Sequence, residues 1–304
     1  MTQLLNALPG ALAQGLIWGV MAIGVYITYK VLDIADLTVD GSICTGAAVC
    51  TMLLLGGQSP WLALLCAVLA GVLAGAVTGL LHVGLGIPPI LAGILTQMVL
   101  WSVNLKLLGK ANQALPARTT PVLLSQMDVG GALPVLLGFC VVLMALLVLF
   151  FGTELGCALR ATGCNPVMSR AQGVNTGLMK VVGLALSNGV VALSGALLCQ
   201  YQGYTDVNMC RGAVVIGLAA VVIGQAVLGR RGGRMAVQLG GVILGAVIYY
   251  IVYQVIIFAG FDTDLLKMFS AVVVAVFLGA PHVKAQLKAH SRSKKGDSGH
   301  AENE

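Results

Sequence analysis

The sequence predicts an all-α polytopic membrane protein with about nine transmembrane helices. Of its 304 residues, 58% are hydrophobic and only 9% are charged, whereas soluble domains carry about 25% charged residues. The apolar residues form continuous runs rather than the alternation that is typical of a transmembrane barrel. Glycine, with 40 residues, is about twice as frequent as its usual ~7%, and small residues let membrane helices approach closely.

Nine apolar runs are the expected spans. Two of them, 41–56 and 212–228, are short for a hydrocarbon core of about 30 Å, which needs about 20 residues. Each short run follows a polar turn, at 32–41 and at 200–212. In chain order the spans are 11–29, 41–56, 60–83, 87–108, 132–151, 177–199, 212–228, 235–259 and 265–282.

Positive charge orients these spans, because lysine and arginine accumulate in cytoplasmic loops. With the N-terminus outside, 5 of the 17 basic residues lie outside and the other twelve are cytoplasmic. We therefore expect the N-terminus outside and the C-terminus in the cytoplasm. The cytoplasmic set is Lys30, Arg160, Arg170, Lys180, Arg230, Arg231, Arg234, Lys284, Lys288, Arg292, Lys294 and Lys295.

The two ends of the chain differ in character. No lysine or arginine precedes Lys30, so the first apolar run lacks the basic start of a signal peptide and is expected to stay as a membrane helix. The tail, residues 284–304, has no apolar periodicity and is expected to be a disordered cytoplasmic segment. Residues 1–283 are then the transmembrane domain.

Two stretches share one pattern. Residues 15–56 and 177–228 both contain a long helix, a polar turn and a short Gly/Ala-rich helix. With five spans before the middle of the chain, the two halves lie inverted in the membrane. Inverted repeats with interrupted helices are typical of transporters, in which the irregular parts line the pathway. The alternative is two ordinary short helices with loops.

Small residues and cysteines carry weaker signals. GxxxG spacings at Gly71–Gly75–Gly79, Gly15–Gly19 and Gly241–Gly245 favour helix packing inside one subunit, with a dimer contact as the alternative. The 8 cysteines are scattered without a CxxC pair, which indicates neither a disulfide framework nor a metal site.

The motifs of catalytic sites are absent from the sequence. It contains no P-loop, HExxH, GxSxG or zinc-ligand spacing. The polar groups within the apolar runs are mild, and they either bond helices together or line a pathway. Asp40 starts a short helix, so it is either a helix cap or a pathway residue. The pathway candidates are Asp40, Thr96, Gln97, Asn104, Ser187 and Asn188.

The polar turn before the second short helix contains Asp206, Asn208 and Arg211. In the chosen orientation this turn lies outside. These residues either contact a docked partner or are simply solvated.

The segment 153–176 is too polar to span a membrane, and the orientation places it in the cytoplasm. Its residue pattern predicts a pair of short helices. Asn165 is expected to cap the second helix with Pro166 at its first position, and Gly173 to end it before Asn175 starts the next span. Such a pair suits a groove on another protein, and a helical loop on the membrane surface is the alternative.

The same segment resembles the permeases of ABC importers for branched-chain amino acids, ribose and related solutes. The resemblance lies in the run of Gly156, Arg160, Ala161, Gly163, Asn165, Gly173, Val174 and Asn175, followed by GLALSNGVVALSGALLCQYQG at 183–203. It covers most of 1–283. It implies the type II importer architecture, with ATPase coupling by Glu154, Gly156, Arg160, Ala161, Gly163, Asn165, Arg170, Gly173 and Asn175.

The resemblance also implies the setting of the protein. It implies a homodimer in the bacterial cytoplasmic membrane with two cytoplasmic ATPase subunits and an extracytoplasmic substrate-binding lipoprotein. ATP-Mg belongs to the ATPase subunits, so this chain has no cofactor and is no enzyme, and no nucleic acid is involved. Asp206, Asn208 and Arg211 would then dock the binding protein.

Three stretches resemble the branch of this family for aromatic amino acids, tryptophan or tyrosine: ADLTVDGS (35–42), ILAGILTQMVLWSVNLKLLGKAN (90–112) and ALSNGVVALSGALLCQYQGYTDVNM (185–209). Cys164, Cys210 and Gln225 depart from the residues expected there. The first hypothesis is thus the permease of an ATP-driven importer of an aromatic or branched-chain amino acid. An ion-coupled secondary transporter, with Asp40 as the ion ligand, is the alternative. A membrane-embedded enzyme or scaffold ranks last.

Overall fold

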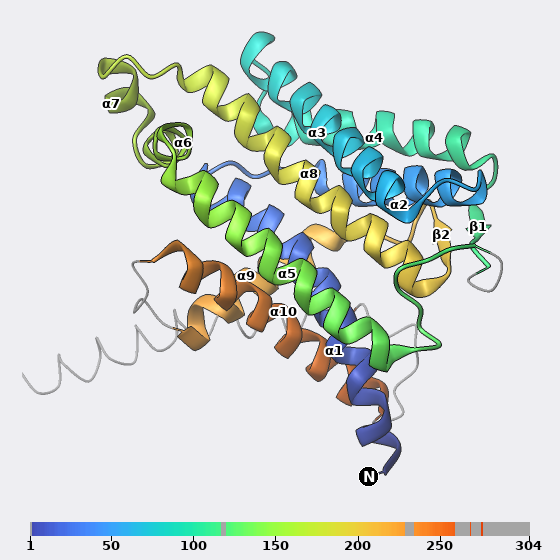
Figure 1. Cartoon of the computed structure of the whole chain (residues 1–304). Coiled ribbons are helices and arrows are strands. Elements are labelled where there is room, and N and C mark those ends of the chain that lie inside the picture. The colour runs from blue at the N-terminus through green and yellow to red at the C-terminus, as the bar shows by residue number, and fades with distance from the viewer. Residues whose placement is uncertain (1, 117–119, 229–233, 259–267, 269–274, 276–304) are drawn as a thin grey trace, which may run out of the picture.

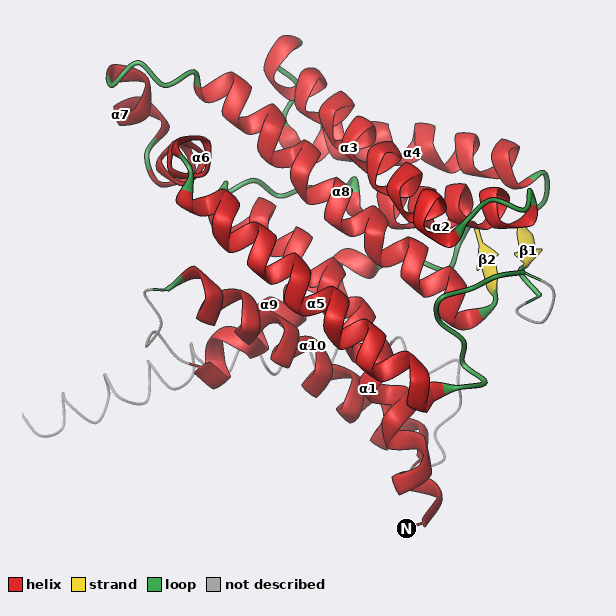
Figure 2. Cartoon of the chain, viewed as in Figure 1, coloured by secondary structure: helices red, strands yellow, loops and turns green. Residues whose placement is uncertain are grey.

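The computed structural model describes residues 2–116, 120–228 and 234–258, together with residues 268 and 275. Helices make up most of these residues (Figures 1 and 2). They are α1 (Thr2–Tyr26), η1 (Ile27–Val31), α2 (Val39–Leu55), α3 (Pro60–Gly84), α4 (Pro89–Leu108), α5 (Val129–Gly152), α6 (Glu154–Cys164), α7 (Pro166–Ala171), α8 (Thr176–Gln202), α9 (Ala213–Leu228) and α10 (Met235–Phe258).

Eight of the nine predicted spans coincide with helices to within a few residues. Among the described residues, six helical stretches are long and apolar enough to cross a membrane: Leu8–Val31, α3, α4, α5, α8 and α10. The two helices expected to be short, α2 and α9, are shorter apolar helices in the structure as well. The ninth predicted span, 265–282, and the tail, 284–304, lie outside the described residues.

The helices of the first half are interrupted between α1 and α2, and we call this segment, residues 27–38, the first interruption. It begins where the α-helical winding of α1 changes to a π-helical one. The π-helical turn η1 follows directly, and the chain leaves the helix at Leu32. Asp33 then has a positive φ of 56°, a conformation that Asp tolerates better than most residues. The chain stays irregular up to Thr38, and α2 begins at the next residue. Irregular backbone at membrane depth is tolerated only beside protein or a watery cavity.

The packing of the two halves supports an inverted repeat. α3 packs on α8, and in the same way α10 packs on α1; α2 packs on α8, and α9 packs on α1. Each half therefore places its second and third helices against the first helix of the other half. α1 runs toward α6, whereas α8 starts beside α7 and runs away from it (Figure 1). The two first helices are thus antiparallel, as inversion requires.

The GxxxG glycines are used inside this subunit. Gly71, Gly75 and Gly79 of α3 all face α8, where a Cβ at Gly75 would overlap the Leu184 carbonyl oxygen. A Cβ at Gly245 would likewise overlap the carbonyl oxygen of Ala220 in α9. Because only glycine allows these backbones to come so close, these faces hold the bundle together.

A small sheet adds to the predicted all-helical fold. Strand β1 (Asn112–Ala114) pairs antiparallel with β2 (Tyr204–Asp206), with Asn112 opposite Asp206. The strands are only three residues long, which is too short for a periodic pattern that would predict them from the sequence. The sheet lies at the end of the bundle opposite α6 and α7 (Figure 2).

Candidate functional site

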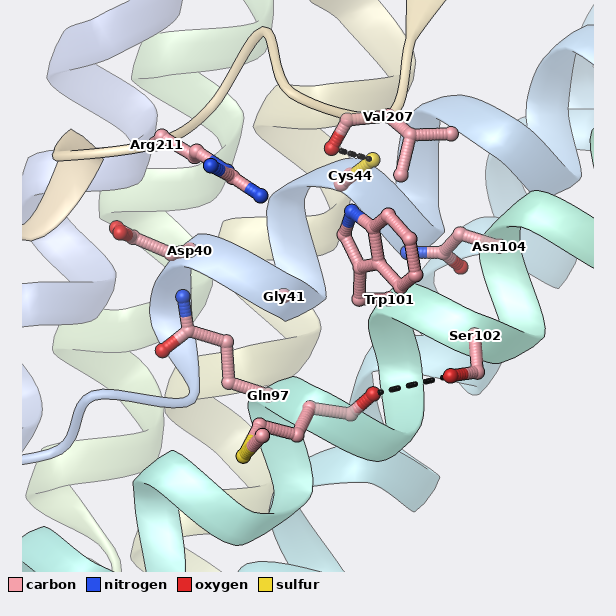
Figure 3. Close-up of a pocket in the computed structure, with 10 residues that line it drawn as sticks. Asp40, Gly41, Cys44, Gln97, Trp101, Ser102, Asn104, Val207 and Arg211 are labelled. Carbon is pink, nitrogen blue, oxygen red and sulfur yellow. Dashed lines mark hydrogen bonds between the residues drawn. The ribbon is translucent and has the colours of Figure 1, made fainter. Parts of the chain in front are cut away.

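A cavity of about 610 Å³ lies where the first turn of α2 meets α4 and the segment before α9. Figure 3 shows its polar side chains arriving from these three separate parts of the chain. Its lining residues are Asp40, Gly41, Cys44, Gln97, Met98, Trp101, Ser102, Asn104, Val207 and Arg211.

Asp40 connects the two halves of the molecule. One of its carboxylate oxygens accepts a hydrogen bond from the Gly212 backbone N–H (2.9 Å), and the other accepts one from the Val214 N–H (3.0 Å). The first turn of a helix has N–H groups without partners inside the helix, and a carboxylate satisfies them well. Asp40 therefore caps α9 of the second half, while it belongs to α2 of the first half and lines the cavity.

Asp36 holds the irregular turn that leads into α2. Its side chain is buried and accepts a hydrogen bond from the Thr38 N–H at 2.8 Å. Its other oxygen accepts one from Asn188 Nδ2 at 2.7 Å, and Asn188 Oδ1 in turn accepts one from the Ser42 hydroxyl at 2.6 Å. Asn188 is thus fully occupied in joining α8 to the first interruption.

Three of the predicted pathway residues lie in helix contacts rather than on the cavity wall. The Ser187 hydroxyl donates to the Gly24 carbonyl oxygen at 2.8 Å and so ties α8 to α1. Thr96 accepts from the Thr78 hydroxyl at 3.0 Å, between α4 and α3. With Asn188, these residues act as polar links between helices, the alternative that the sequence left open.

The cavity wall that α4 contributes is a single helix face. Gln97, Trp101 and Asn104 are spaced four and then three residues apart, which places them on one side of a helix. Within the described part of the chain, the buried Asn104 amide makes no hydrogen bond of good geometry, and the one polar group beside it is the weakly bonding Cys44 thiol. The neighbouring Cys44 thiol donates instead to the Val207 carbonyl oxygen at 3.5 Å.

The three residues predicted to dock a binding protein separate in the structure. Asp206 is in β2, where its side chain accepts hydrogen bonds from the Asn208 N–H (2.7 Å) and from Asn112 Nδ2 (3.4 Å). Asn208 is exposed just beyond the strand. Arg211 instead lines the cavity.

Arg211 also borders a second cavity, of about 550 Å³, which α1 and α10 line with aromatic rings. Among these rings Tyr250 contacts three others, with ring centroids 5.8 Å from Trp18, 5.6 Å from Tyr249 and 5.9 Å from Tyr253. Arg211 therefore lines both the 610 Å³ cavity and this aromatic cavity.

The segment 153–176 forms the two short helices that its sequence predicts. Asn165 Oδ1 accepts hydrogen bonds from the Val167 and Met168 N–H groups at 3.1 and 3.0 Å, with Pro166 as the first residue of α7. Gly173 follows α7 with φ of 84°. Asn175 then caps α8 by accepting from the Leu178 N–H at 3.1 Å. The predicted caps and helix ends are all confirmed.

The glycines of this segment are close to other backbone atoms. A Cβ at Gly163 would overlap the Val31 carbonyl oxygen, and one at Gly156 would overlap the Phe150 carbonyl oxygen. Leu159 is fully buried between them, in the same apolar cluster as Leu32. α6 is therefore seated on the end of η1, where any larger residue at position 163 would push it away.

The charged residues of the segment differ in their freedom. Arg170 Nε donates to the Thr176 hydroxyl at 2.7 Å, so this side chain holds α7 against the start of α8. Arg160 is exposed, donates only to the Cys157 thiol on its own helix at 3.4 Å among the described residues, and lines a small cleft with Lys30. Glu154 is exposed in the first turn of α6, where its charge suits the helix dipole, and Ala161 is exposed on the same helix.

Comparison with known proteins identifies the family. The model of the family described as branched-chain amino acid transport system / permease component matches residues 8–280. The chain belongs to this permease family. It is 37% identical over 292 residues to a tyrosine transport system permease protein of Clostridioides difficile (strain R20291), a match that covers 93% of this chain and 94% of the relative.

Two other relatives of the permease are more distant. An uncharacterized protein of Rickettsia prowazekii (strain Madrid E) is 33% identical over 279 residues, covering 91% of this chain and 98% of the relative. The autoinducer 2 import system permease protein LsrC of Escherichia coli (strain K12 / DH10B) is 29% identical over 216 residues, covering 67% and 60%. No solved structure gives a significant match.

Sequence reasoning overlooked two residues of this permease. Asp36 stands in the same polar turn as Asp40, three residues after Asp33, and its burial follows only from the way that α8 crosses the turn. Trp101 was visible as the residue midway between Gln97 and Asn104 on one helix face, and that spacing could have identified it.

Proposed function

We propose that this permease is the membrane-spanning subunit of an ATP-driven importer of an aromatic amino acid, with tyrosine as the first substrate to test. The observation that carries the proposal is the 37% identity, over 93% of the chain, to a tyrosine transport system permease protein. A similarity of this extent includes both interrupted helices and the segment 153–176. The fold supports it, because inverted repeats with short helices are typical of transporters.

The proposed assembly contains two copies of this chain, two cytoplasmic ATPase subunits and an extracytoplasmic binding lipoprotein. The ATPase subunits supply ATP-Mg and the hydrolysis, and this chain contributes no cofactor. The chain lies in the bacterial cytoplasmic membrane with its N-terminus outside. In this orientation α6 and α7 face the ATPase, and the β1–β2 end faces the binding protein.

The contacts of α6 suggest how the two ends communicate. α6 packs on η1 through Gly163, whose neighbour is the Val31 carbonyl oxygen. The chain continues from η1 to Asp36 and Asp40, and Asp40 is bonded to the first turn of α9. A displacement of α6 by the ATPase would therefore reach the cavity along a short and continuous stretch of chain. In this account Arg160 faces the ATPase and Arg170 maintains the shape of the segment.

The experiment is reconstitution of the permease with its ATPase subunits and binding protein in liposomes. Arg160→Glu should lower ATP-dependent uptake of L-tyrosine at least about tenfold, because it reverses a charge at the proposed contact, while the complex still purifies intact. Arg160→Lys, which keeps the positive charge at the same position, is the matched control and should transport normally.

Uptake at the normal rate by Arg160→Glu would contradict the coupling role. Uptake that needs no ATPase subunit and disappears with an ion gradient would contradict the importer itself, and would favour the secondary transporter.

A further inference from the structure

Two polar groups of the 610 Å³ cavity have no role in holding the fold together. Among the described residues, the Asn104 amide has no hydrogen-bond partner apart from the weak Cys44 thiol, although its side chain is only 1% exposed. The Arg211 guanidinium has neither a hydrogen bond nor an ion pair with any described residue, and Arg211 is exposed at the cavity. A buried amide without partners costs folding free energy, so its presence on a cavity wall indicates a group that comes from a ligand.

The charged groups gather at one end of this cavity. Figure 3 shows Asp40 and Arg211 near each other, with Trp101 and Asn104 farther along the wall. The Asp40 oxygens accept from the Gly212 and Val214 N–H groups, and the Ala213 N–H also faces them. A carboxylate has about four acceptor positions, so one remains for an ammonium group. The planar fork of an arginine matches a carboxylate. A negative and a positive side chain together suit a zwitterion.

The other end of the cavity suits an aromatic ring that carries a hydroxyl group. Trp101 and Met98 both line the cavity and offer the flat and polarizable surfaces on which rings pack. The Asn104 amide lies beyond them and can both donate to and accept from a phenol. A volume of about 610 Å³ is within the range of sites for small molecules.

We propose that this cavity is a tyrosine-recognition site within the permease itself. Arg211 binds the carboxylate, Asp40 the ammonium group, and Asn104 the phenol hydroxyl. The inference rests on the proposed function, since it places the substrate of the importer in this cavity. It goes beyond that function because it assigns selectivity to this chain as well as to a binding protein. Phenylalanine or leucine would leave Asn104 unpaired, and a site built to bond a hydroxyl discriminates against ligands that lack one.

The test is equilibrium binding of radiolabelled L-tyrosine and L-phenylalanine to the full-length permease in lipid nanodiscs, with no ATPase subunit or binding protein present. Asn104→Leu should weaken tyrosine binding about tenfold, the loss of one hydrogen bond to a buried group, and should change phenylalanine binding by less than about twofold. Arg211→Gln should weaken both by more than about tenfold. Asn112→Leu and Lys110→Gln are the matched controls outside the cavity, and they should bind as the wild type does.

A tyrosine-to-phenylalanine affinity ratio that is unchanged in a folded Asn104→Leu variant would overturn the proposal. Leucine replaces an unpaired amide with a side chain of similar size, so the variant should elute as the wild type does in size-exclusion chromatography. If it does not, competition by L-leucine against L-tyrosine on the wild-type permease decides, and equal affinities would overturn the proposal. Tyrosine uptake by the whole importer with an unaltered affinity ratio in Asn104→Leu would reject this site and leave the importer function standing.

Discussion

The two interruptions of the membrane helices share one sequence pattern but differ in burial and in hydrogen bonding. The first, before α2, is folded inward, with Asp36 buried and bonded to Thr38 and Asn188. The second, before α9, is open, with a short strand and with Arg211 exposed. The contact between them is not symmetric, because a side chain of the first half, Asp40, caps α9 of the second half.

This difference shows how an inverted repeat can build an asymmetric site. The first interruption and the start of α2 contribute two acids: Asp36, which holds the fold, and Asp40, which caps α9 and lines the cavity. The second contributes a cation that the described fold does not use. Disturbing the first interruption should therefore cost stability, whereas disturbing the second should alter binding and leave the fold intact. The predictions below test this division, from the largest expected effect to the smallest.

Asp36→Leu should have the largest effect. It leaves the Thr38 N–H and one donor of Asn188 buried without partners, and each such loss costs about 1–3 kcal/mol. We expect a loss of about 4 kcal/mol from the free energy of unfolding, measured by denaturation in detergent. Asp33→Asn is the control, since Asp33 is exposed and asparagine also tolerates its positive φ. Equal stability of the two variants would show that the first interruption is not held by Asp36.

Gly163→Val should separate α6 from η1, because its side chain would occupy the space of the Val31 carbonyl oxygen. Overpacking of this kind costs about 1–3 kcal/mol. In the reconstituted importer we also expect ATP hydrolysis to continue while uptake falls. The control is Gly152→Ala, where a Cβ would meet no atom within 4 Å. Tightly coupled uptake by Gly163→Val would exclude this contact as the link between the two ends.

Asp40→Ala should remove the cap of α9, which typically costs about 1 kcal/mol. We expect a decrease in melting temperature that is smaller than the decrease for Asp36→Leu, because the Gly212 N–H is in an exposed region and can turn to water. Thermal unfolding followed by circular dichroism measures both. A decrease larger than that for Asp36→Leu would reverse the proposed order of the two acids.

Asn208→Ala should have the smallest effect. Asn208 is exposed, and its backbone N–H, which the substitution retains, makes the bond to Asp206. Exposed substitutions of this kind change stability by about 0.5 kcal/mol or less. The same unfolding assay applies, and a loss above about 2 kcal/mol would show that the second interruption carries structural weight after all.

The parts of the structure that depend on near neighbours in sequence could be predicted. Asn165 and Asn175 cap helices through N–H groups two or three residues away, so a short window of sequence contains the whole interaction. The apolar runs likewise specify α2 and α9 as short helices, because length and composition alone decide this.

The cavity could not be predicted in the same way, because its contacts join distant residues. The partners of Asp40 are 172 and 174 residues further along the chain. Thr96 and Gln97 are neighbours in sequence, yet Thr96 turns to Thr78 of α3 and Gln97 turns to the cavity. Only the packing of the helices decides which side chain bonds another helix and which lines the cavity.

The central claim is best tested by tyrosine uptake in bacterial cells that lack their own copy of this permease. Cells supplied with the wild-type chain and its partner subunits should accumulate radiolabelled L-tyrosine. This uptake should stop when ATP is depleted, and it should persist when an ionophore collapses the ion gradients while ATP is maintained. Uptake that survives ATP depletion and is abolished by the ionophore would contradict the account of this chain as the permease of an ATP-driven importer.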